Sequence, residues 1–437
     1  MNVKPNALFT NDNLFVLNGM NSACVDMIYL DPPFNSKRFY SAPIGSQAAG
    51  ASFKDMWTWD DVDWALLVRL TKQHPHFVQF IQSIERAHGR AMMSYIAFMA
   101  QRVFEMHRVL KPAGSIYLHC DQTAGHYLKI MLDFIFGSGN FRNEIVWWYN
   151  KWTNAAKHFQ RNHDVVLAYS KSEKYVFNRQ YIQTAHKEKV LERGWDRNVA
   201  KGVRQLLVYD RAKAKAEVKK ARAKKTKIVY MDKKPEGVAA PDVWSDINYL
   251  SSGSKERVGY PTQKPVDLLK RIIAAGSDEG GVVLDPFCGC ATTLVAAQHL
   301  RRRWIGIDVE EKAGELVRDR LATEMGLFND FTHYRDLPDR DDYPRANPRD
   351  KAVRSRLYGD QNGRCGGCRK RFDIENMETD HVVPRAKGGG DFFENFQLLC
   401  GRCNRIKGDR PMEYLLSVIA AMQERHTMFG ALPYGKH

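Results

Sequence analysis

The stretch LDPFCGCATT, residues 284–293, decides the fold. An apolar strand candidate, GVVLD, ends at Asp285, a tight turn contains Gly289, and a helix begins near Thr292 or Thr293. Because glycine has no Cβ, the backbone of such a turn can approach a ligand closely. The stretch therefore predicts a strand–turn–helix unit that binds a nucleotide-like ligand at the end of a strand.

The following strand candidate, WIGID, ends at Asp308. A carboxylate at that place can accept hydrogen bonds from both hydroxyls of a ribose. A phosphate cradle requires a more glycine-rich loop or a lysine after it, and neither is present. The segment therefore favours a nucleoside without phosphates, although a strand–turn–helix unit of this kind also occurs in unrelated α/β proteins.

The stretch LDPPFNS, residues 30–36, follows a second strand candidate, VDMIYL. Proline lacks an N–H, so backbone carbonyls of this turn stay free of local hydrogen bonds. The Asp31 carboxylate and one carbonyl can accept both hydrogens of an exocyclic amine, while Phe34 stacks on its base. Two such acceptors favour a tetrahedral nitrogen whose lone pair attacks a methyl group in line. A base within a duplex must be flipped out to reach this turn. In isolation, DPPF is an ordinary turn.

The net charge indicates the kind of partner that the protein binds, and the chain length indicates the number of domains. The 437 residues include 66 Lys and Arg against 50 Asp and Glu, and residues 201–227 are especially basic. This length allows two or three domains. The surplus favours a nucleic acid, because basic side chains release counterions from phosphates, with a basic non-binding surface as the alternative. The absence of a long apolar run and of a signal-peptide pattern predicts a cytoplasmic protein with no membrane partner.

Strand-like and helix-like segments alternate in the first third of the chain and again from residue 264. The predicted strands are residues 25–30, 115–120, 144–149, 164–170, 281–285 and 304–308. The predicted helices are residues 92–110, 124–136, 264–276 and 292–300, with another from about 310. This alternation indicates an α/β fold. Residues 150–257 interrupt it with basic and aromatic side chains, including a solvated helix at 211–225.

Five motifs, in this order, resemble the site-specific DNA amino-methyltransferases of the β arrangement: DPPFNS, RVLKPAGSIYLHCD, GYPTQKPVDLLKRII, LDPFCGCATT and WIGID. The resemblance covers about residues 5–325. It implies a seven-stranded Rossmann-like sheet with helices on both faces and S-adenosylmethionine as methyl donor. Residues 1–328 would form this domain, with residues 150–257 as its target-recognition insert.

The resemblance also implies roles for individual residues. The catalytic loop would consist of Asp31, Pro32, Pro33 and Phe34. The cofactor would lie among Asp285, Phe287, Gly289 and Asp308, with Lys264 beside its carboxylate. DPPF, in place of a motif that begins with serine, indicates adenine as the target, with cytosine as the alternative.

One position departs from the family pattern. The family usually has glycine where this chain has Ala291. We expect this position to lie in the first turn of the helix, where alanine is harmless.

A separate module follows a polar, proline-containing linker at residues 329–349. Residues 350–437 contain two C-x-x-C pairs, Cys365 with Cys368 and Cys400 with Cys403. Without a secretion signal, this spacing favours a metal over disulfides. Four thiolates fit a closed tetrahedral structural Zn²⁺ site.

Between and after the cysteine pairs lie the polar residues Asp380, His381, Asn395 and Asn404. With the cysteines, they resemble the HNH, or ββα-metal, nucleases. The resemblance implies that His381 is the general base and that Asn395 orients its ring. Asp380 and Asn404 would hold Mg²⁺ or a similar divalent cation.

These two resemblances predict a fused restriction-modification protein that methylates and cuts double-stranded DNA. Two alternatives stay open. The zinc module could be only a DNA-binding appendage, or the methyltransferase could act on RNA or on a protein glutamine.

Overall fold

The computed structural model describes residues 2–35, 38–43, 46–58, 61–62, 74–151, 157–182, 185–200, 203–231, 237–251, 253–325, 331–412, 414–419 and 422. Ser36 and residues 201–202, which belong to motifs quoted above, lie outside this part of the chain. The chain divides into two compact units. The first comprises Met1–Val176 and Ser245–His437, and the second comprises Phe177–Trp244.

Among the described residues, the main sheet has nine strands, two of them short strands at its edges. The other seven lie in the order β6-β7-β5-β2-β14-β15-β1, and all but β1 were predicted. Their bounds are β6 (Phe141–Trp148), β7 (His163–Ser170), β5 (Leu110–Cys120), β2 (Val25–Leu30), β14 (Val282–Asp285), β15 (Arg303–Asp308) and β1 (Ala7–Thr10). The strands from β5 to β1 pair in parallel, whereas β7 is antiparallel to both β5 and β6. The predicted Rossmann-like sheet is confirmed.

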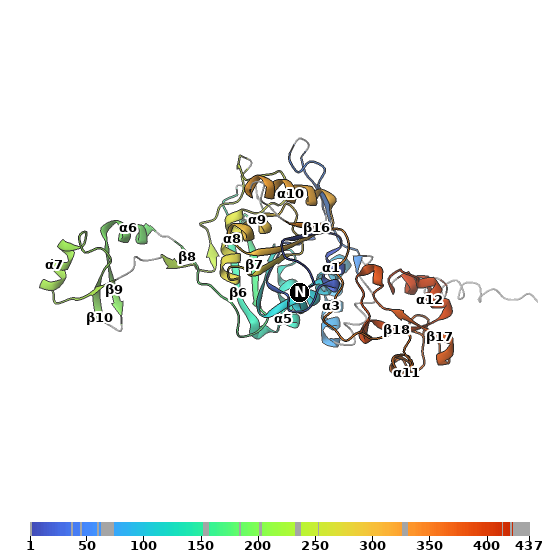
Figure 1. The fold of residues 1–437 in the computed structure, drawn as a ribbon. Helices are drawn as coiled ribbons and strands as arrows, with labels where there is room; N and C mark the ends of the chain where they lie inside the picture. Colours follow the sequence, from blue (N-terminus) through green and yellow to red (C-terminus); the bar gives the residue numbers. More distant parts are fainter. Residues whose placement is uncertain are drawn as a thin grey trace, which may run out of the picture. The chain divides into compact units, whose positions relative to one another are not determined.

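Helices cover both faces of this sheet (Figure 1). Helices α1 (Asn13–Gly19), α3 (Pro75–Ala87), α4 (Arg90–Val109) and α5 (Gly125–Phe136) pack on one face. Helices α8 (Val266–Gly276), α9 (Thr292–His299) and α10 (Glu311–Met325) lie on the other. Strand β14 is buried along its length and β2 is buried except at Asp26, because both faces of the sheet are covered, which explains why most of their residues are apolar.

The end of β2 determines where the loop Asp31–Phe34 begins. The strand stops at Leu30, one residue before Asp31 and the two prolines. Proline cannot donate to a strand ladder, so the chain leaves the sheet there. It then forms a hairpin of β3 (Arg38–Ser41) and β4 (Ser52–Asp55).

Two strands of the main sheet lie within segments that were predicted to be an insert and a linker. Residues 163–170 form β7, and the compact second unit, Phe177–Trp244, lies within the predicted insert at 150–257. Strand β16 (Thr332–Tyr334) pairs in parallel with β1, so the first part of the predicted linker 329–349 belongs to the sheet. The sequence of β16 is too short for a periodic pattern, and its neighbour β1 lies more than three hundred residues earlier in the chain.

The second unit contains a three-stranded sheet of β9 (Trp195–Ala200), β10 (Val203–Val208) and β11 (Lys227–Tyr230). It also contains α6 (Ala185–Arg193), α7 (Lys215–Ala223), β8 (Tyr181–Ile182), β12 (Val238–Ala239) and β13 (Val243–Trp244). A small core of Leu206, Val208, Ala214 and Ala221 joins α7 to the sheet. Helix α7 is shorter than the helix predicted at 211–225. It buries one narrow face against this core.

The C-terminal module has its own core. After α11 (Lys351–Asp360), strands β17 (Met377–His381) and β18 (Phe396–Cys400) form a hairpin that leads into α12 (Gly401–Lys407). This is the expected ββα arrangement. Among the described residues, no helix has the length and apolar character needed to cross a membrane.

Candidate active site

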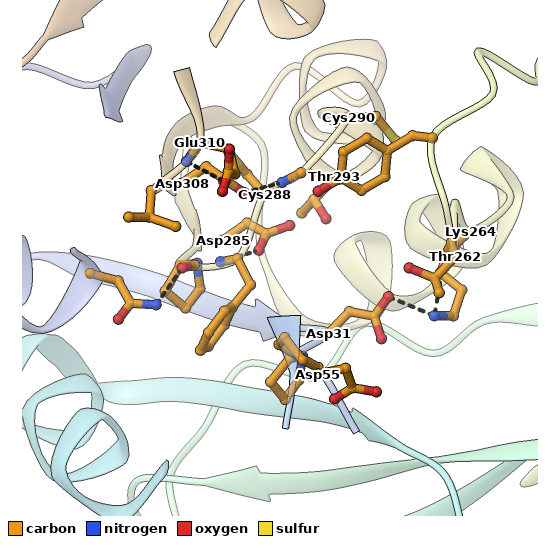
Figure 2. Close-up of a pocket in the computed structure, with 18 of the residues that line it drawn as sticks. Asp31, Asp55, Thr262, Lys264, Asp285, Cys288, Cys290, Thr293, Asp308 and Glu310 are labelled. Atoms are coloured by element: carbon orange, nitrogen blue, oxygen red, sulfur yellow. Dashed lines mark hydrogen bonds and ion pairs between the residues drawn. The ribbon is translucent and has the colours of Figure 1, made fainter. Parts of the chain in front are cut away.

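The two motifs that the sequence singled out line one cavity of about 390 Å³ (Figure 2). Strands β2 and β14 are parallel neighbours, so their C-terminal ends meet at the same sheet edge. From the loop after β2 come Asp31, Pro32, Pro33 and Phe34. From the other side come Asp285, Phe287, Gly289 and Asp308, together with Lys264.

Lys264 contacts the candidate catalytic aspartate directly. Its Nζ lies 2.6 Å from Asp31 Oδ2, and both side chains are mostly buried (Figure 2). The same Nζ is 5.3 Å from the centroid of the Phe34 ring. The sequence predicted Lys264 beside the carboxylate of a cofactor; the structure gives it the Asp31 carboxylate as partner.

Asp55 holds the end of the catalytic loop, and sequence reasoning missed it. Its Oδ1 accepts a hydrogen bond of 2.5 Å from the backbone N–H of Asn35. Asn35 has a φ of 60°, a left-handed conformation that asparagine tolerates better than most residues. Asp55 is buried at the end of β4, so the hairpin after the loop fixes its shape.

Two buried carboxylates line the opposite side of the cavity. Burial raises the pKa of Asp285 to about 7, against hydrogen bonds from Thr293 and the Phe287 N–H. Burial likewise raises the pKa of Asp308 to about 6, although its carboxylate accepts hydrogen bonds from the Gly289 and Glu310 N–H groups. This side therefore suits a ligand that carries positive charge and hydrogen-bond donors.

Position 289 requires glycine because the Tyr260 ring lies close to its backbone. Its φ is 47°, and a Cβ at this position would lie 3.0 Å from the Tyr260 ring. Tyr260 lines the cavity but was not among the predicted residues. It lies in the motif GYPTQKP, before Lys264, and that proximity was the available signal.

The expectation that Ala291 lies in the first helical turn was wrong. Ala291 is the N-cap residue of α9 and has φ 67° and ψ 21°. This left-handed conformation brings Cβ close to a carbonyl oxygen, which glycine avoids. The sequence could not distinguish the cap from the first turn, because the two differ by one residue.

Arg102 links α4 and α1 to the Pro286 side of the cavity, and sequence reasoning missed it too. This buried side chain of α4 donates from Nε to Asn13 Oδ1 at 2.6 Å. Asn13 Nδ2 in turn donates to the Pro286 carbonyl at 2.7 Å. Asp12 caps α1 and accepts from Arg102 Nη2. An Asp before an apolar run, as in DNLFVL, is a helix-start signal that could have identified this segment.

In the C-terminal module, His381 has a different partner from the one predicted. Its Nε2 lies 2.7 Å from Asp391 Oδ1, and Arg385 also binds this carboxylate. Asn395 is fully buried, and its amide bonds to the backbone N–H and carbonyl of Val383. The prediction that Asn395 orients the His381 ring was therefore wrong, because its amide satisfies the backbone of the intervening loop.

Asp380 and Asn404 are also bonded to protein groups. Asp380 Oδ2 lies 3.0 Å from the Nζ of Lys407, a fully buried lysine that requires a counter-charge. Asn404 donates to Glu378 on the same hairpin. The structure thus adds Lys407 and Glu378 to the residues around the expected cation site.

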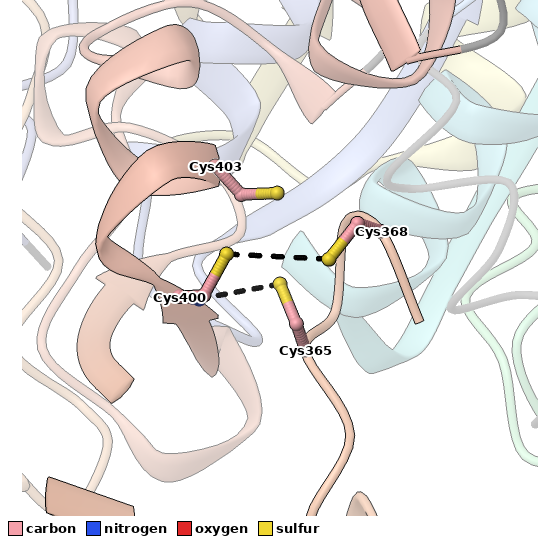
Figure 3. Close-up of side chains that lie close together, drawn as sticks. All are labelled: Cys365, Cys368, Cys400 and Cys403. Atoms are coloured by element: carbon pink, nitrogen blue, oxygen red, sulfur yellow. Dashed lines mark hydrogen bonds between the residues drawn. The ribbon is translucent and has the colours of Figure 1, made fainter. Parts of the chain in front are cut away.

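The four cysteines meet as the spacing predicted (Figure 3). Their Sγ atoms all lie within 4.8 Å of one another. A tetrahedral Zn²⁺ with about 2.3 Å bonds to sulfur places sulfurs about 3.8 Å apart, so the cluster fits zinc. The Cys400 N–H donates to Cys365 Sγ at 3.2 Å, a hydrogen bond that stabilises a thiolate.

The fold and this site define an α/β methyltransferase joined to a ββα module. The chain belongs to the DNA methylase family, whose model matches residues 25–319. The model of the HNH endonuclease family matches residues 365–410. The chain is therefore a DNA N-methyltransferase with a fused HNH domain.

Curated relatives agree with this assignment. A type II methyltransferase of Enterobacter cloacae, M.EcaI, is 27% identical over 76% of this chain and 72% of its own. The Mod subunit of the type III restriction-modification enzyme StyLTI of Salmonella typhimurium is 26% identical, over 74% of this chain and 53% of its own. The DNA adenine methyltransferase YhdJ of Escherichia coli is 29% identical, over 50% of this chain and 64% of its own.

The left-handed backbone at Ala291 generates a stability prediction. We expect Ala291→Gly to raise the free energy of unfolding by roughly 1 kcal/mol, because glycine adopts positive φ without the Cβ clash. Denaturant unfolding followed by circular dichroism measures this change.

Ala296→Gly in the same helix is the matched control. Ala296 lies inside α9, where glycine destabilises by roughly 1 kcal/mol, so the two identical substitutions should have opposite signs. A destabilised Ala291→Gly variant would show that the cap tolerates alanine after all.

Proposed function

We propose that this methyltransferase uses S-adenosylmethionine to methylate the exocyclic amine of a flipped adenine in double-stranded DNA. The observation that carries the proposal is that Asp31 and the buried pair Asp285 and Asp308 line one cavity. One side of this cavity offers acceptors for an amine, and the other offers buried carboxylates for a cationic nucleoside.

The protein groups divide the work between the two reactants. Lys264 holds one Asp31 oxygen, which leaves the other oxygen to accept from the target amine. A carbonyl of the Pro32–Pro33 turn is the second acceptor, and the partly exposed Phe34 ring stacks on the base. These fixed acceptors align the nitrogen lone pair, so most of the acceleration comes from positioning.

On the other side, Asp308 accepts hydrogen bonds from ribose hydroxyls, and Gly289 allows the close approach of the ligand. The acidic lining suits the sulfonium and ammonium groups of S-adenosylmethionine, which when bound supplies the activated methyl group. Adenine is favoured over cytosine by the DPPF motif, and one relative is named as a DNA adenine methyltransferase.

Methyl transfer tests this function. Purified chain, labelled S-adenosylmethionine and unmethylated bacteriophage DNA should give labelled DNA, and methylome sequencing of expressing cells should show N6-methyladenine in a defined sequence. Asp31→Ala should lower the rate by roughly a hundredfold or more, because one acceptor in the transition state is lost.

Asp267→Ala is the control for that substitution. Asp267 lies on α8 near Lys264 in sequence, but its side chain is 81% exposed. The methyl-transfer rate of Asp267→Ala should equal that of the unmodified chain. Unlabelled DNA, or transfer that survives Asp31→Ala, would refute the proposal, and label in RNA or protein would redirect it.

The raised pKa values of Asp285 and Asp308 predict pH-dependent cofactor binding. Hydrogen-bond donors of the cofactor favour the ionised carboxylates, so binding lowers both pKa values and releases protons. Affinity should therefore rise as pH increases through about 6 and 7. Titration calorimetry at pH 6.5 in two buffers of different ionisation enthalpy counts the released protons.

Asp308→Asn removes one of the two groups, so it should reduce that proton release. The pH dependence has the opposite sign for folding of the ligand-free chain. A carboxyl whose folded pKa is raised stabilises the fold below its unfolded pKa of about 4, and this stabilisation is lost as pH rises through the folded pKa. Affinity that stays constant between pH 5 and 7 would contradict the assignment of these carboxylates to the cofactor.

We further propose that the HNH domain hydrolyses DNA as part of a restriction-modification fusion. His381 accepts the proton of the attacking water, and its ring is held by Asp391. Asp380 and Asn404 would provide oxygen ligands for a cation such as Mg²⁺, which when bound would stabilise developing negative charge. The four cysteines would hold a structural Zn²⁺, which would link the hairpin to α12.

Zinc removal separates the two activities. A thiol reagent that releases Zn²⁺ should abolish cleavage of bacteriophage DNA in Mg²⁺, because the ββα core loses its cross-link, while methyl transfer continues. Metal analysis should find one Zn²⁺ per chain before treatment. Cleavage that persists in His381→Ala would refute the nuclease, and absent cleavage in the untreated chain would leave the domain as a DNA-binding appendage.

A further inference from the structure

A buried histidine lies behind the catalytic loop and has no part in the chemistry described so far. His119, on β5, is fully buried. Its ring packs against Phe34 with centroids 6.1 Å apart and planes 25° apart. One side of Phe34 is therefore backed by an imidazole.

Hydrogen bonds at both ring nitrogens hold His119 in place. Its Nε2 lies 3.2 Å from Asp164 Oδ2 on β7, and its Nδ1 lies 3.0 Å from the Tyr29 hydroxyl on β2. Asp164 also accepts a hydrogen bond from the Tyr149 hydroxyl. The ring is thus tied to the strands on both sides of β5, one of which leads into the catalytic loop.

The protonation of this network follows from its partners. Burial alone raises the pKa of Asp164, but the hydrogen bond from His119, with Lys264 and Tyr149, lowers it to about 2. The carboxylate is therefore ionised and can only accept, so His119 Nε2 must donate to it. Burial keeps Tyr29 protonated, which allows its hydroxyl to donate to Nδ1.

Aromatic edges restrict the ring further. Trp147 and Tyr29 both meet His119 edge to face, at centroid distances of 6.0 and 6.3 Å. Trp147 is itself anchored by a hydrogen bond of 2.9 Å to the Ile247 carbonyl. The His119 ring is thus held by two perpendicular aromatic contacts and at both nitrogens, and the Phe34 ring stacks against it.

We propose that His119 is a positioning residue for methyl transfer: it sets the plane of Phe34, and thereby the plane of the flipped base. This inference rests on the proposed function, because Phe34 must stack on that base. Asp164 and Tyr29 act through His119. In this proposal, none of these three residues contacts the reacting atoms. The base amine must be aligned with Asp31, so a tilt of Phe34 misdirects the nitrogen lone pair.

Three substitutions separate the ring from its hydrogen bonds. His119→Phe keeps a ring against Phe34 but removes both hydrogen bonds. His119→Gln keeps a polar partner for Asp164 without the ring. His119→Ala removes the ring and the hydrogen bonds. Tyr117→Phe is the matched control, since Tyr117 is a buried ring two residues away on β5 and outside the cavity. It should behave as the unmodified chain.

The measurements are single-turnover methyl transfer, the Kd for S-adenosylmethionine, and the fluorescence of 2-aminopurine placed at the target base. The duplex carries the sequence found by methylome sequencing. His119→Ala should lower the transfer rate roughly tenfold to a hundredfold. Its Kd for the cofactor should change less than twofold, and the bound 2-aminopurine should be less quenched because its stack on Phe34 is looser. His119→Phe should recover part of the quenching.

Transfer at the unmodified rate in His119→Ala would overturn the inference. So would equal losses of cofactor binding and transfer in all three variants, since these would indicate a purely structural role. If His119→Ala does not fold, His119→Phe against Tyr117→Phe decides the question by the same readouts. Failure of the unmodified chain to methylate DNA would instead refute the proposed function.

Discussion

The parallel pairing of β2 with β14 is the constraint on which the site depends. Met27 lies opposite Val283 and Ile28 opposite Leu284, so both strands end at one sheet edge. A register shift of one residue would turn each side chain to the other face of the sheet and separate the two loops. The pairing is stabilised by apolar residues buried on both faces. Asp31 and Asp285 therefore owe their shared cavity to the core beneath them.

Several carboxylates of this protein are buried, and they differ in their hydrogen-bond partners. Asp285 and Asp308 accept hydrogen bonds from backbone N–H groups, and burial raises the pKa values of both carboxyls. By contrast, Asp31 has Lys264, Asp164 has His119, and Asp380 has Lys407. In the cavity, Asp285 and Asp308 thus have neutral donors and can bind a cationic ligand, whereas Asp31 is paired with the Lys264 cation. This asymmetry matches a bisubstrate site in which one ligand is a cation.

The methyltransferase domain and the C-terminal module are stabilised by different means. The methyltransferase sheet is large enough to bury a continuous core between helices. The C-terminal module buries a much smaller apolar cluster, to which three of its four cysteines belong. Small cores of this kind require a cross-link, and the cysteine cluster provides the ligands for one. The insert Phe177–Trp244 relies on a still smaller core and presents the most basic segment of the chain.

Sequence alone determined the features that are local: the strand that ends just before Asp31, the strands that end at Asp285 and Asp308, the ββα module, and the cysteine pairs. Such features depend on periodicity, proline and glycine chemistry, and ligand spacing within a short segment. Tertiary structure decided the partners. Lys264 binds Asp31 across 233 residues, His119 lies behind Phe34, and Asp391 in place of Asn395 holds His381. It also decided that Ala291 has a left-handed backbone. Hydrogen-bond partners and backbone angles depend on how separate segments pack, and no pattern within one segment records that.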